Sequence, residues 1–63
     1  MLLLPRIELH LQRRRMAPTR FGREAVNDPR FVFDLRDGRH PREATASRVC
    51  AYLDRYEHGG AGV

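Results

Sequence analysis

The first apolar stretch of the chain has a helical period. Leu4, Ile7 and Leu11 are three and four residues apart, which places them on one face of a helix over residues 3–15. Pro5 is compatible with a first helical turn. One short face cannot bury every leucine of this segment, and those left over are candidates for contact with a partner subunit. They are Leu2, Leu3 and Leu9.

A second, shorter helix is predicted from about Pro18 to Val26. Proline disfavours helical geometry in the residue before it, so Pro18 separates this helix from the first. Its inward residues are Phe21, Ala25 and Val26.

The third helix has the sharpest start signal in the sequence. Asp28 is a good N-cap residue and Pro29 suits the first helical position, so a helix is predicted over residues 29–37. Gly38 ends it, because glycine readily takes the left-handed conformation that follows many helices. The inward side consists of Val32 and Leu35, with Phe31 beside them.

The last helix is predicted from about Glu43 to Glu57, and residues 58–63 are predicted to form a disordered, glycine-rich tail. Together the four helices predict one compact all-α domain over residues 1–57 that contains a helix-turn-helix. The apolar stripe of the last helix consists of Ala46, Val49, Leu53 and Tyr56, flanked by Cys50 and Tyr52.

The charge of the chain favours an anionic partner. Its twelve strongly basic residues are all arginine, and the net charge is +4 with a pI near 10.6. The planar guanidinium fork suits phosphate or carboxylate, and a domain pI above about 9 is common among nucleic-acid-binding domains. A GC-rich genome, which favours arginine codons, explains the absence of lysine equally well.

Catalytic, metal-binding and membrane functions have no support in the sequence. Cys50 is expected to be a small buried residue, and His10, His40 and His58 lie far apart without the spacing of metal ligands. No catalytic residue, metal or cofactor is predicted, and the chain is not expected to be an enzyme. The apolar start is far shorter than the roughly 20 residues of a membrane span. A cytoplasmic protein without membrane contact is therefore expected; a weaker alternative is an organellar presequence at the arginine-rich start.

The segment from Thr19 to Arg39, followed by Pro41 and Thr45, resembles the Xre-type, lambda-repressor-like helix-turn-helix family. The matching features are the apolar and small pair Phe21-Gly22, the apolar residues three apart in the third helix, and Gly-Arg before proline and threonine. The resemblance extends over roughly residues 4–57. It implies a small transcription regulator of prokaryotic or phage type whose helix near residues 28–37 enters the major groove of double-stranded DNA. A homodimer would double its few base contacts.

Two positions of this motif carry structural predictions. Gly22 is expected to let the third helix approach closely, whereas its alternative role is only to weaken an exposed helix by about 1 kcal/mol relative to alanine. The family usually has glycine in the turn, where this chain has Val26 and Asn27. Asparagine tolerates left-handed geometry, so the turn is expected to survive.

Candidate DNA contacts follow from the resemblance and from the helix faces. The base-contact candidates are Arg30, Phe33 and Asp34. The phosphate-contact candidates are Thr19, Arg20, Arg36, Arg39, His40 and Arg42. An alternative for Arg36 and Arg39 is pairing with nearby acids: Asp34, Asp37 or Glu43.

Two other functions stay open. Phe33 beside Asp34 and Asp37 suits a basic protein surface, so the domain is alternatively an interaction module that binds a basic protein through its third helix. A third function is nonspecific association with RNA or DNA, driven by net charge alone.

Overall fold

The computed structural model describes residues 3–59 as four α-helices and a short π-helical extension, and this part of the chain contains no strand. These elements are α1 (Leu3–Arg14), α2 (Pro18–Val26), α3 (Phe31–Arg36), α4 (Glu43–Asp54) and η1 (Arg55–Gly59). The predicted small all-α domain is confirmed. Of the predicted tail, residues 60–63 lie outside the described residues. Between residues 3 and 59, no helix has the length and apolar character needed to span a bilayer.

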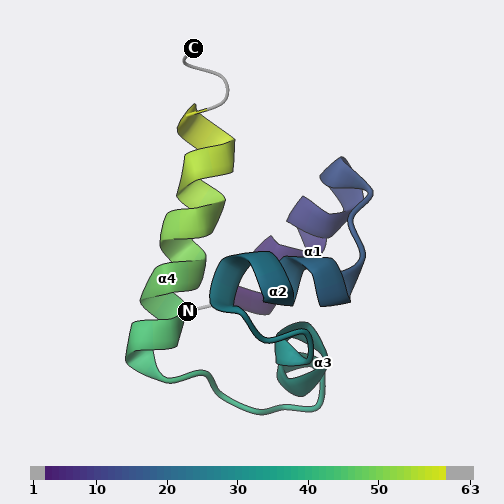
Figure 1. Ribbon diagram of the computed structural model, residues 1–63, viewed down its shortest axis with the longest axis vertical. Helices are drawn as coiled ribbons and strands as arrows, with labels where there is room; N and C mark the ends of the chain where they lie inside the picture. The colour runs from purple at the N-terminus through teal and green to yellow at the C-terminus, as the bar shows by residue number, and fades with distance from the viewer. Residues whose placement is uncertain (1–2, 60–63) are drawn as a thin grey trace.

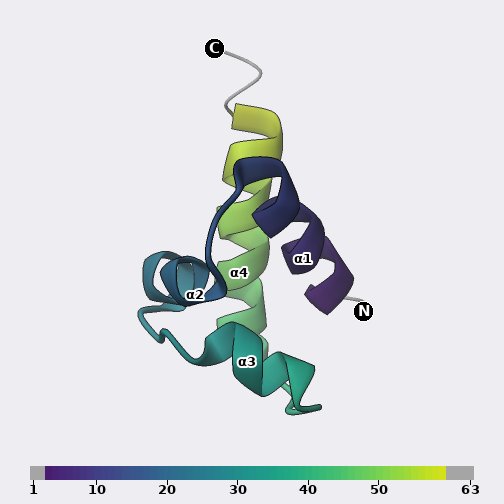
Figure 2. The same cartoon turned by 90° about the vertical axis from the view of Figure 1, so that its right-hand side faces the viewer.

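α1 and α2 pack against α4, which continues into η1 as the longest rod of the fold, and α3 packs against α2 and α1 (Figure 1). α1 lies beside the middle of this rod, and α3 lies at the lower end of the domain (Figures 1 and 2). α2 and α3 cross steeply, since α2 runs across the view in Figure 1 but is seen end-on in Figure 2, where α3 runs across. α3 is therefore placed at one end of the molecule.

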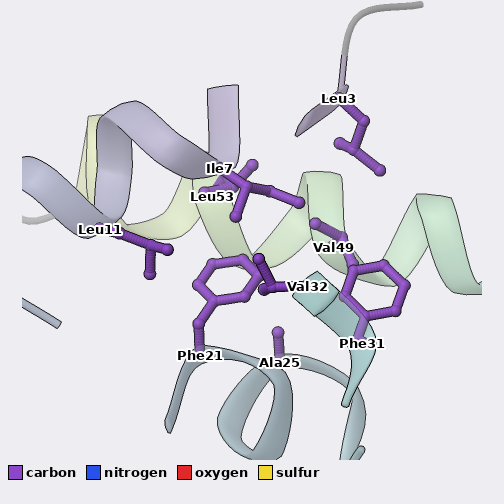
Figure 3. Packing of buried hydrophobic residues seen from close by; sticks show 9 residues of the cluster. All are labelled: Leu3, Ile7, Leu11, Phe21, Ala25, Phe31, Val32, Val49 and Leu53. Atoms are coloured by element: carbon purple, nitrogen blue, oxygen red, sulfur yellow. The ribbon is translucent and has the colours of Figure 1, made fainter. Parts of the chain in front are cut away.

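A single core joins all four helices (Figure 3). The largest fully buried side chains come from every helix, and burial of each is worth about 1.5–3 kcal/mol. The core consists of Leu3, Ile7, Leu11, Phe21, Ala25, Phe31, Val32, Val49 and Leu53. Leu4, Val26, Leu35, Ala46, Cys50 and Tyr52 are partly buried against it.

The buried face of α1 differs from the predicted one. Leu3 is buried and Leu4 is only partly buried, so the prediction that Leu4 faces inward and Leu3 is left over was wrong. The buried residues of α1 are Leu3, Ile7, His10 and Leu11, which are four, three and one positions apart along one helical face. The buried face of α1 therefore includes His10. Leu9 remains 46% exposed.

Gly22 allows the turn after α2 to fold back onto the helix. Asn27 takes the left-handed conformation, with φ 58° and ψ 34°, as predicted. The backbone N–H of Asp28 then donates to the carbonyl oxygen of Gly22 at 3.0 Å. A Cβ atom on Gly22 would lie 2.1 Å from the Asp28 carbonyl oxygen and 3.3 Å from Cβ of Phe31. The predicted packing role of Gly22 is confirmed, and its closest neighbour is the turn.

α3 begins two residues later than predicted. The N–H of Phe31 donates to the carbonyl of Asp28 at 3.1 Å, which closes a tight turn over Pro29 and Arg30 before α-helical bonding begins. The carboxylate of Asp28 accepts the backbone N–H of Arg30 at 3.0 Å, so it caps this turn. Gly38 ends the helix with φ 94°, as predicted.

Replacing Gly22 with alanine is expected to lower the free energy of unfolding by about 1–3 kcal/mol, because the added methyl group overpacks the turn. Urea unfolding measures the effect. Arg23→Ala, at an exposed position of the same helix, is the control and should change stability by less than about 0.5 kcal/mol. Stabilisation by Gly22→Ala would contradict the close approach.

Candidate nucleic-acid interface

α3 has one buried and one exposed side, and the three predicted base-contact residues lie on or beside the exposed one. Phe31 and Val32 are buried in the core. Arg30 is exposed, Phe33 is 42% exposed and Asp34 is half-buried. The exposed side of this short helix thus presents a cation, an aromatic ring and a partly covered carboxylate.

The loop after α3 brings four of the predicted residues to one groove. Arg39, His40 and Arg42 line it together with Asp34, in a depression of about 330 Å³ between α3 and the start of α4. Asp28 and Thr45 complete its polar lining. The groove therefore has two guanidinium groups and two carboxylates at its edge.

The start of α2 faces the same side as α3, toward the viewer in Figure 2. Thr19 and Arg20 are exposed there. Nε of Arg20 donates to Oε2 of Glu24 at 2.7 Å, and the hydroxyl of Tyr52 donates to the other oxygen of that carboxylate at 3.0 Å. These bonds, the one from Arg20 above all, lower the pKa of Glu24. Arg20 thus has an acidic neighbour with which a phosphate would compete.

Arg36 joins α3 to α1. Its Nε and Nη2 donate to the two carboxylate oxygens of Glu8, each at 2.8 Å. This bidentate pair lowers the pKa of the Glu8 carboxyl. The predicted alternatives of Asp34, Asp37 or Glu43 as partners of Arg36 were wrong, because Glu8 reaches it from α1. The guanidinium carbon of Arg36 also lies 5.6 Å from the centroid of the Phe33 ring.

Three arginines of the site have no carboxylate partner among residues 3–59: Arg30, Arg39 and Arg42. The site as a whole is nevertheless electrically balanced. Residues 28–43, which cover the turn, α3 and the loop, contain four arginines and four acids and so have no net charge. Any anion bound here would be held by individually placed guanidinium groups rather than by a general positive field.

Sequence reasoning missed a polar network near the start of α1. The guanidinium of Arg6 donates to Asp54 and, through two nitrogens at 2.9 and 3.2 Å, to Glu57. These bonds raise the pKa of Arg6 and tie α1 to the end of α4. No pattern in the sequence predicts pairing between groups that are 48 and 51 residues apart.

His10 lies in an aromatic cage that was also not predicted. Its ring makes edge-on contacts with Phe21 at 5.5 Å and with Tyr52 and Tyr56 at 5.7 Å each, measured between centroids. The residue is 6% exposed, and its Nε2 has no hydrogen-bond partner among the described residues. Burial lowers the pKa of this imidazole, so it is neutral at pH 7 in the folded protein. Its position three residues after Ile7 was the one available signal.

Comparison with family models, with curated proteins and with solved structures gave no match for this chain.

Acidification is expected to destabilise the protein through His10. The unfolded chain has the ordinary histidine pKa of about 6.5, whereas burial depresses that of the folded protein. Below about pH 6.5 and above the lower pKa of the folded protein, the unfolded state binds a proton that the folded state does not. The free energy of unfolding therefore falls by at most about 1.4 kcal/mol for each unit by which the pH is lowered. Urea unfolding between about pH 8 and 5 should show a smaller decline in His10→Phe. An equal decline in both proteins would exclude this role.

Proposed function

We propose that this domain binds double-stranded DNA through α3 and residues 39–42, as a regulator of the Xre-like type. The observation that supports it is a set of three exposed arginines on α3's flanks that have no acidic partner among residues 3–59. They are Arg30, Arg39 and Arg42, and they border the lower helix of a steeply crossed pair. A helix presented in this way fits the major groove, and the loop beyond it reaches the neighbouring backbone.

The proposal divides the roles of these arginines. Arg30 stands at the start of α3, where recognition helices make base contacts, and its fork suits a guanine edge. Arg39 and Arg42 lie in the loop and suit phosphates. Arg36 and Arg20 are assigned a smaller part, because Glu8 and Glu24 already hold them. One reading residue gives little specificity, so the proposal includes a homodimer with half-sites about 34 Å apart.

The test compares Arg30→Ala with Arg39→Ala on duplexes selected from genomic DNA. Arg30→Ala is expected to reduce discrimination between selected and scrambled duplexes by about 1–3 kcal/mol. Arg39→Ala should weaken binding to both alike and reduce the salt slope by about 1. Fluorescence anisotropy at several salt concentrations measures both. Equal losses with unchanged preference in the two variants would contradict the assigned roles.

A second candidate function is binding to a basic protein. It is favoured by the exposed ring of Phe33 beside Asp34 and Asp37, and by the zero net charge of residues 28–43. Phosphates repel carboxylates, whereas a basic protein surface would attract them. If the protein binds no duplex even at low salt, this candidate replaces the first.

A further inference from the structure

The net positive charge of the chain lies outside residues 28–43, the segment that contains α3 and the loop after it. Because residues 28–43 have no net charge, the other eight arginines and four acids carry the whole +4. Each of those four acids is already paired: Glu8 with Arg36, Glu24 with Arg20, and both Asp54 and Glu57 with Arg6. The remaining arginines of this part of the chain are therefore uncompensated among the described residues.

Half of these uncompensated arginines are consecutive. Arg13 and Arg14 end α1 and Arg15 follows directly after it. All three are exposed and have no carboxylate partner within residues 3–59. The other three, Arg23, Arg48 and Arg55, are spread over α2, α4 and η1. The carbonyl end of a helix favours cations, which explains why the cluster is tolerated without acids.

The central member of the cluster stacks on an aromatic ring, and its side chain makes no hydrogen bond to another residue of the part of the chain that the structure describes. The guanidinium carbon of Arg14 lies 4.5 Å from the centroid of the Tyr56 ring. Stacking on an aromatic face leaves the N–H groups, which point outward in the guanidinium plane, free for an anion. Arg13 and Arg14 border the same depression of about 280 Å³. Arg15 follows in the left-handed conformation with φ 51°, so the chain turns away just after the cluster.

This cluster is remote from α3. The end of α1 lies at the upper part of the domain in both views, whereas α3 lies at the bottom (Figures 1 and 2). A ligand at the end of α1 therefore meets other residues than those proposed for base contact.

We propose that Arg13, Arg14 and Arg15 form a second binding surface for the phosphate backbone of duplex DNA, separate from α3. Forked guanidinium groups match phosphate oxygens two at a time. DNA presents a phosphate charge about every 1.7 Å along its axis, so three adjacent arginines engage it without regard to sequence. This inference does not depend on the function proposed for α3.

The test uses the double variant Arg13→Gln/Arg15→Gln, which leaves the stacked Arg14 in place. Its control is Arg23→Gln/Arg48→Gln, which removes the same charge from exposed positions outside the cluster. Binding to a mixed-sequence duplex is titrated across a salt series, and thermal unfolding checks that each variant is folded. Loss of two phosphate contacts is expected to reduce the salt slope by about 2, with a smaller change in the control. Equal slopes in the variant and its control would overturn the proposal.

Two further outcomes distinguish this proposal from the function proposed for α3 and from binding of an acidic protein. If Arg30→Ala/Arg39→Ala leaves binding and sequence preference unchanged while the cluster variant loses affinity, the α1 surface stands and the proposed function of α3 fails. Poly-glutamate serves as a competitor of similar charge. Competitor concentrations are compared per negative charge. If poly-glutamate displaces the duplex at a lower concentration than unlabelled DNA does, the surface prefers acidic protein, and the proposal that it binds DNA is wrong.

Discussion

The contact between Gly22 and the carbonyl of Asp28 is the constraint on which the arrangement of this domain depends. The turn folds back so closely that a Cβ atom on Gly22 would lie 2.1 Å from that carbonyl oxygen and clash with it. This return path brings Phe31 and Val32 into the core. α3 has only six residues, too few to be stable alone, so its position is set by this packing. The exposure of Arg30 and Phe33 on its other side follows from the same contact.

The main effect of the surface ion pairs is to determine which arginines are available to bind an anionic partner. The bidentate pair of Arg36 with Glu8 lies at the surface, where an ion pair contributes about 0–1 kcal/mol. Its larger consequence is electrostatic. Pairing removes Arg6, Arg20 and Arg36 from the set of free cations. The end around α3 then keeps three arginines against four acids, whereas the end of α1 stays basic. A domain with this distribution has two surfaces of different character.

The local parts of the fold were predictable from the sequence, and the long-range parts were not. Helical spacing located the four helices, and the turn residues Asn27 and Gly38 have the left-handed geometry predicted for them. The start of α3 was misplaced because Asp28 caps a tight turn rather than the helix itself. Glu8 as the partner of Arg36 was missed, since local spacing says nothing about groups 28 residues apart. The DNA-contact roles of the arginines remain predictions.

Amide hydrogen exchange tests the central constraint most directly. If the turn is locked against Gly22, the amides of Asp28 and Phe31, which donate to the carbonyls of Gly22 and Asp28, should exchange only with global unfolding, as the core amides of α2 do. Exchange of these two amides as fast as that of the exposed loop residues 39–42 would contradict the account. In that case the position of α3, and every role assigned to its exposed side, would lose its foundation.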